Sequence, residues 1–364
     1  MTVLLFVHNY NFAPFVTTPS TLVTSSFSIS NFIEYLFSNS VFRFRIGLLM
    51  IISGYLLGNH SYVPYRALMT KKIKTLVVPY LLVSFISFLI IILIEIIFIG
   101  IHSSHGILGK NIAQFTVKDY FFYIFLSPLP FQLWYLKSIF MMTALSPVIR
   151  WLLQKMPLQT FLIMFAIWMF TNYLDGETRD RAFIFYIFGY YIGMSNKDIS
   201  KPISFLNPKT ALSLFVAISF LRTGLAFLNP HIFFNVKYVL IMLFKVNEIV
   251  GAYAVWFCFD DIINWVDGKK WYKTIVNSSF FIYAFHAPLL NFMSDIAMKR
   301  NIPHLILYIG LPALLLPLLI GTDILIRNNF AKFYSVLTGG RNALENAKKQ
   351  KRYFLKVVSI NAAA

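Results

Sequence analysis

Long apolar runs separated by short polar segments extend along most of the chain. A helix needs about 20 apolar residues to cross roughly 30 Å of hydrocarbon, and ten runs approach that length, although the first and sixth are short. The pattern predicts an all-α, polytopic integral membrane helix bundle of about ten helices, the first one incomplete. The predicted spans are 1–10, 41–57, 76–101, 131–153, 158–173, 182–194, 210–228, 238–259, 274–292 and 304–326.

Composition supports a membrane protein. Of the 364 residues, 58% are hydrophobic and only 13% are charged, whereas soluble domains carry about 25% charged residues. The net charge of +18 is spread between the apolar runs rather than gathered in one patch, so we expect no nucleic-acid partner. The single cysteine, Cys258, cannot form an intrachain disulfide, and no Cys/His spacing typical of a metal site is present.

The distribution of Lys and Arg predicts the orientation in the membrane. If the first span leaves the cytoplasm, the inner segments hold 20 basic residues and the outer segments 10. The positive-inside rule then places both termini in the cytoplasm. We predict a transmembrane domain over 1–330 and a basic cytoplasmic tail over 331–364 that rests on anionic lipids. The segments 11–40 and 102–130 are expected to be outer loops.

Ionisable groups inside predicted spans are candidates for function, because burying them in a membrane is costly. His8, near the outer end of the first span, is suited to proton transfer from a hydroxyl; the alternative is an interfacial histidine bonded to a neighbouring helix. Lys245 and Glu248 lie three residues apart and could neutralise each other. The complete set is His8, Glu95, Lys137, Lys245, Glu248, His286 and Asp323, with Arg43 and Arg45 at an outer end.

Three further stretches combine basic and aromatic residues. Lys71, Lys72 and Lys74 form a cationic collar that would suit a polyphosphorylated cofactor such as coenzyme A; ordinary positive-inside anchoring is the alternative. Trp134 and Lys137 lie at the outer end of the fourth span, where Lys137 either snorkels to water or holds a hydroxylated or anionic substrate. Tyr283 and His286 share one helical face, and His286 either makes a structural hydrogen bond or contacts substrate.

Four stretches in order resemble the membrane-bound acyltransferase 3 family, and its fucose 4-O-acetylase and polysaccharide O-acetylase branch in particular. They are "VLLFVHNYN", "LLMIISGYLL" followed by a basic run and "LVVPYL", "LWYLKSIFMMTALSPVI", and "SSFFIYAFHAPLL". The resemblance implies transfer of an acyl group, usually acetyl from acetyl-CoA, to a hydroxyl of an envelope or exported glycan at a bacterial inner membrane. A glycan or lipid-linked sugar would be the acceptor.

The resemblance also implies roles for individual residues. His8 matches the histidine that acts as catalytic base or acyl carrier, and Lys71, Lys72 and Lys74 would contact coenzyme A. The residues implied on the acceptor side are Arg43, Trp134, Lys137, Tyr283 and His286. Relatives carry an arginine about ten residues before the histidine, which here falls before Met1, so an N-terminally truncated chain is expected.

Two other functions stay open from the sequence. Ten spans with buried charges are also compatible with a polysaccharide or small-molecule exporter, although the chain has no internal repeat of the kind that builds many transporters. The second alternative is an inactive, truncated acyltransferase.

Overall fold

The computed structural model describes most of the membrane-embedded chain, and every regular element in it is a helix, which confirms the all-α class. The described residues are 3–9, 22–23, 27–59, 63–94, 96–97, 114–126, 128, 130–174, 183–195, 201–202, 204–228, 236–298 and 302–340. Glu95, most of the predicted outer loops and residues 341–364 of the predicted tail lie outside them.

The helices follow one another without an intervening domain. The first part of the chain forms α1 (Val3–Val7), α2 (Ile29–Tyr35), η1 (Leu36–Ser40), η2 (Val41–Arg43), α3 (Phe44–Asn59), α4 (Tyr65–Lys72), η3 (Ile73–Val77), α5 (Val78–Ile94), α6 (Val117–Phe121), η6 (Phe122–Leu126), η7 (Phe131–Leu133), α7 (Trp134–Ala144) and α8 (Ser146–Lys155). The remainder forms α9 (Pro157–Leu174), α10 (Phe183–Met194), α11 (Pro208–Ala226), α12 (Val236–Cys258), α13 (Asp260–Val266), α14 (Lys270–Met298), α15 (His304–Asn329) and α16 (Ala331–Leu337).

Several helices can cross a membrane. Among the described residues, five helical runs are long and apolar enough to do so, or six if one bent pair counts as a single span. The five runs are Ile29–Asn59, Tyr65–Leu93, Pro208–Ala226, Val236–Cys258 and His304–Asn329. Two shorter apolar helices, Pro157–Phe170 and Phe183–Met194, accompany them. A multi-pass helical membrane protein is therefore confirmed, while the number ten stays a prediction.

The second predicted span is longer than its hydropathy indicated. Residues 29–40, predicted as part of an outer loop, are helical and continue into α3, so that prediction is wrong. Ser28 begins the helix by accepting a hydrogen bond from the Asn31 amide at 3.1 Å, which is the capping role that serine favours. Sequence hydropathy missed this part because its polar residues at 38–40 are buried within the bundle rather than exposed. Similarly, α6 and η6 interrupt the predicted loop 102–130.

The fourth predicted span, 131–153, is not one straight helix. It consists of α7 and α8, whose axes differ by 58° across Leu145. Pro147 is in the first turn of α8, where it has no N–H to donate and its ring crowds the preceding turn. The chain therefore bends at this point, and the prediction of a single span over 131–153 is corrected to a bent pair.

Glycines bring α3 and α10 into direct backbone contact. A Cβ at Gly54 would overlap the Tyr186 carbonyl oxygen, and one at Gly189 would overlap that of Ile51. Gly58 and Gly193 make the same kind of approach one turn further on. This spacing of small residues is a common means of helix association in membranes, where lipid supplies no hydrophobic driving force between helices.

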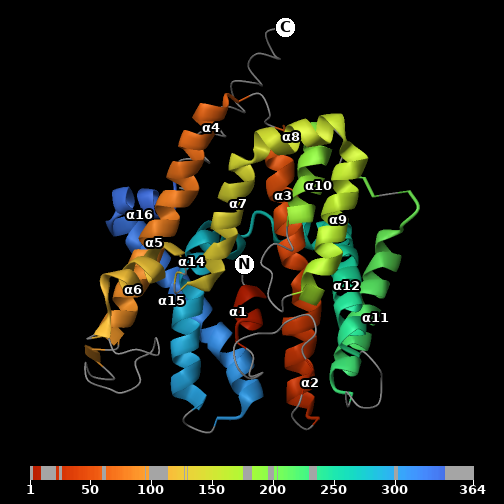
Figure 1. Ribbon diagram of the computed structural model, residues 1–364. Coiled ribbons are helices and arrows are strands. Elements are labelled where there is room, and N and C mark those ends of the chain that lie inside the picture. The colour runs from red at the N-terminus through yellow and green to blue at the C-terminus, as the bar shows by residue number, and fades with distance from the viewer. Residues whose placement is uncertain are drawn as a thin grey trace.

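The short helix α1 lies near the middle of the bundle, between α14 and α15 on one side and α2 on the other (Figure 1). Its Leu4 and Leu5 belong to a large apolar cluster that includes residues of α3, α5, α7, α10, α14 and α15. At the other end of the chain, α16 packs against α5. The surrounding helices therefore enclose the N-terminal residues that the sequence singled out.

Candidate active site

His8 directly follows α1, a helix of only five residues. An isolated helix of that length is unstable in water, so contacts with other helices must fix the position of His8. Two polar side chains supply them. The Asn9 amide nitrogen donates to the carbonyl oxygens of Leu307 and Tyr308 at 2.8 and 3.2 Å, and Ser38 donates to the Phe6 carbonyl oxygen at 2.9 Å.

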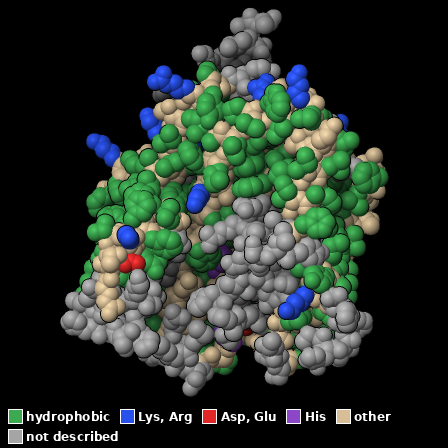
Figure 2. Space-filling view, viewed as in Figure 1, with side chains coloured by type: hydrophobic (Ala, Val, Ile, Leu, Met, Phe, Trp, Pro, Cys, Tyr) green, Lys and Arg blue, Asp and Glu red, His purple; other side chains and the backbone are tan. Residues whose placement is uncertain are grey.

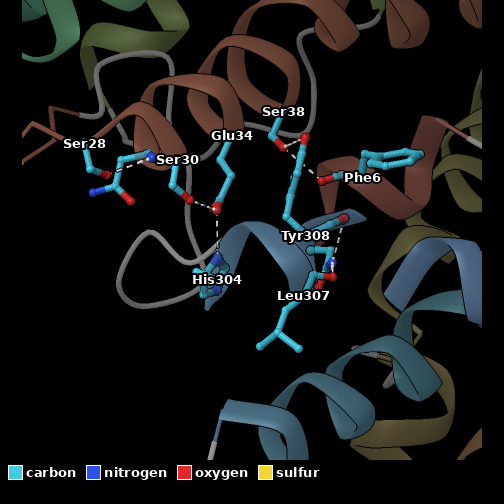
Figure 3. Close-up of polar contacts among 10 residues, drawn as sticks. Phe6, Ser28, Ser30, Glu34, Ser38, His304, Leu307 and Tyr308 are labelled. Atoms are coloured by element: carbon cyan, nitrogen blue, oxygen red, sulfur yellow. Dashed lines mark hydrogen bonds and ion pairs between the residues drawn. The ribbon is translucent and has the colours of Figure 1, made fainter. Parts of the chain in front are cut away.

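The hydrogen bond to Phe6 is part of a chain that joins α1 to α15 (Figure 3). The Ser38 hydroxyl has a single hydrogen, which it gives to the Phe6 carbonyl, a group that can only accept. The 2.8 Å contact between Ser38 and Tyr308 must then have Tyr308 as its donor. The order Tyr308 to Ser38 to Phe6 thus fixes the backbone two residues before His8.

The imidazole of His8 lies between two other rings. Its centroid is 5.4 Å from that of His286 on α14, with an interplanar angle of 30°. The Phe131 ring meets it edge-on at 4.7 Å. Histidine surface is visible in a recess near the middle of the face in Figure 2. The structure therefore brings together two candidate histidines that are 278 positions apart in sequence.

Backbone carbonyls determine the tautomer of neutral His286. Its Nδ1 lies 2.9 Å from the Ile282 carbonyl oxygen and 3.0 Å from that of Tyr283. Carbonyl oxygens accept hydrogen bonds, so Nδ1 carries the hydrogen and Nε2 carries the lone pair. His286 is fully buried, and its Nε2 has no hydrogen-bond partner in the described part of the chain. An acceptor atom is therefore available beside His8.

Two arginines extend the histidine pair towards α3. Arg45 interacts electrostatically with both His8 and His286, and Arg43 does so with His8. Arg45 is held by its Nη1, which donates to the Phe42 carbonyl oxygen at 2.8 Å. Both arginines are partly buried. The candidate site thus combines two imidazoles with nearby positive charge, a setting that favours negative charge on a bound group.

The other residues predicted on the acceptor side are arranged differently. Tyr283 is buried, and its hydroxyl donates to the Gln132 carbonyl oxygen at 2.6 Å, which joins α14 to η7. Trp134 is partly buried, with its ring 6.3 Å from that of Tyr135. Lys137 is exposed while its neighbours on α7 are buried. The structure thus groups Tyr283 with His286 but directs Lys137 towards the outside of the bundle.

The lysines predicted to bind coenzyme A lie at one end of the bundle. Lys71 and Lys72 end α4, and Lys74 follows in η3. Lys71 and Lys74 are exposed and Lys72 is partly buried. In Figure 1, α4 occupies the upper end of the bundle and α1 its middle, and Figure 2 shows Lys and Arg side chains along that upper edge. These lysines are therefore separate from the histidine pair.

Sequence reasoning missed several buried polar residues. Glu34 is fully buried; it accepts hydrogen bonds from Ser30 at 3.2 Å and from His304 Nδ1 at 2.8 Å (Figure 3). Arg222, inside the predicted span 210–228 but absent from the candidates, is fully buried in α11 and donates to the Asn39 carbonyl oxygen. Glu34 lies in a predicted loop and His304 is the first residue of a predicted span, and 270 positions separate them, so neither apolar runs nor local spacing indicated the pair.

Two of the other charged candidates, Lys245 and Asp323, have partners on neighbouring helices. Lys245 donates to the Trp168 carbonyl oxygen and lies 4.7 Å from the centre of the Trp168 ring. Asp323 accepts from Ser278 at 2.8 Å and from Tyr334 at 2.7 Å, and its oxygen is 3.2 Å from Arg327. These contacts indicate structural roles. In the described ranges, no three His, Cys, Asp or Glu side chains are grouped so that they could hold a metal ion.

Comparison with known proteins identifies the family to which the chain belongs. Residues 5–325 match the profile described as "Acyltransferase domain". This chain belongs to that acyltransferase family. The match begins within α1, includes His8 and His286, and stops within α15. The resemblance seen in the four sequence stretches is therefore confirmed, and it assigns a membrane-embedded acyltransferase fold to the bundle.

One relative matches along nearly the whole chain. The "Succinoglycan biosynthesis protein ExoH" of Rhizobium meliloti (strain 1021) is 22% identical over 355 residues, which are 95% of this chain and 91% of that protein. No solved structure matches the chain.

Proposed function

We propose that this acyltransferase transfers an acyl group, acetyl in the first instance, from acyl-CoA to a hydroxyl of an envelope or exported glycan. The observation that carries the proposal is the His8–His286 pair inside the bundle, close to Arg45. The name of the matched relative, a succinoglycan biosynthesis protein, supports a glycan acceptor. A polar site enclosed by helices is also what the reaction needs, because lipid satisfies no polar group.

His8 would perform the proton transfer. As general base it takes the proton of the acceptor hydroxyl while that oxygen attacks the thioester carbonyl. The C–O bond forms, the C–S bond breaks and the proton passes to the departing thiolate. As acyl carrier, His8 would itself attack the thioester and then release the acyl group to the hydroxyl. In both cases the positive charge of Arg45 would stabilise the negative charge that develops on the carbonyl oxygen.

The acyl donor would bind from the cytoplasmic side. Lys71, Lys72 and Lys74 offer positive charge at the end of the bundle, and two of the three are exposed, which fits the several phosphate charges of coenzyme A. Lysine binds phosphate as a point charge rather than through a bidentate fork. The acyl chain would then have to pass from this end of the bundle to α1 at its middle. The acceptor would enter from the opposite, outer side, near Trp134 and Tyr283.

His8→Ala tests the proposal in cells. In a deletion strain of the source bacterium, complementation with the wild-type gene should restore ester-linked acyl groups on surface glycan, and His8→Ala should not. General acid–base groups contribute about 10²- to 10⁴-fold to rate, so we expect acylation to fall at least 100-fold. Thr160→Val is the matched control, because within the described part of the chain the Thr160 hydroxyl bonds to the carbonyl of Met156, the residue just before α9, at 2.7 Å.

The outcome also separates the proposal from an exporter function. Equal membrane levels of the variants establish that insertion is intact. Wild-type glycan acylation in the His8→Ala strain would reject the proposal. Loss of surface glycan itself, rather than of its acyl groups, would point to export.

A further inference from the structure

Two bare hydrogen-bond acceptors lie next to the histidine pair. Gln132 in η7 is 3% exposed and His286 is 0% exposed. Neither Gln132 Oε1 nor His286 Nε2 has a hydrogen-bond partner among the residues that the structure describes. Leaving a buried acceptor unsatisfied is unfavourable, so two such atoms in one place require an explanation.

The other polar atom on each side chain is a hydrogen-bond donor, and this identifies Oε1 and Nε2 as acceptors. The Gln132 amide nitrogen donates to the carbonyl oxygens of Tyr283 and Ala284, at 3.2 and 3.0 Å. His286 Nδ1 donates to the carbonyls of Ile282 and Tyr283. Exchanging the amide atoms of Gln132, or moving the imidazole hydrogen to Nε2, would leave carbonyl oxygens facing other acceptors. Oε1 and Nε2 therefore can only receive hydrogen bonds.

The two side chains converge on one turn of α14, residues 282–286, and this turn is adjacent to His8. His286 contacts the His8 ring directly, and Phe131, the neighbour of Gln132, packs edge-on against the same ring. The Tyr283 hydroxyl donates back to the Gln132 carbonyl oxygen at 2.6 Å, which holds η7 against α14. The acceptors thus have a rigid support beside the proposed catalytic imidazole.

We infer that Gln132 Oε1 and His286 Nε2 form a hydroxyl-binding subsite for the acyl acceptor, an inference that rests on the proposed function. A ligand suited to this subsite must offer hydrogen-bond donors, and a sugar with neighbouring hydroxyls does so. One sugar hydroxyl would lie near His8, beside His286 Nε2, for acylation. A neighbouring hydroxyl would donate a hydrogen bond to Gln132 Oε1. A site with buried polar groups discriminates strongly against ligands that lack the matching hydroxyl.

Acceptor kinetics in membrane vesicles test the subsite. The probe is the host's surface polysaccharide stripped of ester-linked acyl groups by mild alkali, with labelled acetyl-CoA as donor. Gln132→Met keeps the length of the side chain and removes the acceptor. We expect it to raise the KM for polysaccharide about tenfold, the effect of one hydrogen bond, with the KM for acetyl-CoA unchanged. Thr160→Val should change neither constant.

A second variant separates lost recognition from lost folding. Protonated Gln132→Glu retains one donor for the α14 carbonyls and one bare acceptor oxygen. Its KM for polysaccharide should therefore recover towards the wild-type value as the pH is lowered, relative to wild type at each pH, whereas Gln132→Met should not recover. An unchanged KM for polysaccharide in Gln132→Met, equal rises in both KM values, or no recovery of Gln132→Glu would overturn the subsite.

The same vesicles distinguish failure of the subsite from failure of the proposed function. Wild-type protein that transfers no label, or His8→Ala that transfers as much as wild type, rejects the function itself. Label transfer that depends on His8 but not on Gln132 rejects only the subsite.

Discussion

The side chain of His8 is positioned by hydrogen bonds that α1 cannot supply alone. Tyr308 and Ser38 connect the Phe6 carbonyl to α15, and Asn9 makes two further bonds to the same helix. Each of these partners is at least 30 residues away from α1 in sequence. The position of the histidine is thus a property of the assembled bundle.

Substitutions at Tyr308 and Ser38 test whether their hydrogen bonds position His8. Tyr308→Phe removes the hydroxyl that donates to Ser38, and Ser38→Ala removes the bond to Phe6. Because both act through one hydrogen-bond chain, their effects on acyl transfer should not add. We expect each to reduce the rate about tenfold and the double variant to reduce it little further. A double-variant cycle measured on labelled acetyl transfer checks this; strictly additive effects would show that the two residues act independently.

A second prediction concerns the buried carboxylate of Glu34. Its contact with His304 joins α2 to α15, and Ser30 donates to the same oxygen. Glu34→Gln retains the size of the side chain and removes its charge. The free energy of unfolding should fall by about 2 kcal/mol, the usual loss for a hydrogen bond to a charged group. Thermal unfolding in detergent measures it, and an unchanged Tm would remove Glu34 from the contacts that stabilise the bundle.

At the scale of elements, the contacts and bends of the helices depend on buried polar residues and a proline, whose effects a hydropathy pattern does not predict. The apolar runs predicted α3 and α10 and the region of α7 and α8, because hydrophobicity decides whether a segment can cross a membrane. They missed the extension of α3 through α2 and η1, where Glu34 and the polar residues at 38–40 are buried. They also missed the bend between α7 and α8, which a single proline introduces.

Glycine substitutions test the contact between α3 and α10. Gly54→Val would place a side chain against the Tyr186 backbone, and Gly189→Val would do so against Ile51. Both should abolish stable accumulation of the protein in the membrane, because the backbones cannot move apart without losing their packing. Gly310→Ala is the matched control, since a Cβ there meets no atom within 4 Å. Normal levels of both valine variants would contradict this packing.

At the scale of the whole molecule, the order of the four motifs along the chain indicated the family better than any single motif did. Four weak motifs in sequence indicated the acyltransferase family, and the family match over residues 5–325 confirms it. The sequence also indicated His8 and His286, yet it could not place one against the other, because only the folded bundle brings together two residues that are 278 positions apart. Gln132 gave no signal, since a polar residue near a predicted span boundary usually faces water.

Orientation in the membrane is a prediction for the molecule as a whole. The chain has one cysteine, Cys258, so Cys258→Ser gives a background for single-cysteine labelling. We expect Lys71→Cys to react with a membrane-impermeant thiol reagent only from the cytoplasmic side, and Ile302→Cys only from the outer side. Both native residues are exposed, and α4 and the start of α15 lie at opposite ends of the bundle in Figure 1. Labelling of both from one side would contradict the proposed path of the acyl group.

The most direct test of the central claim is transfer of labelled acetyl from acetyl-CoA to alkali-treated polysaccharide by purified protein in vesicles. Wild-type protein and His8→Ala would be compared at equal membrane content. We expect label on the polysaccharide with wild type and a loss of at least about 100-fold with His8→Ala. Equal label on the polysaccharide with both proteins would contradict the assignment of His8 as the group that performs acyl transfer.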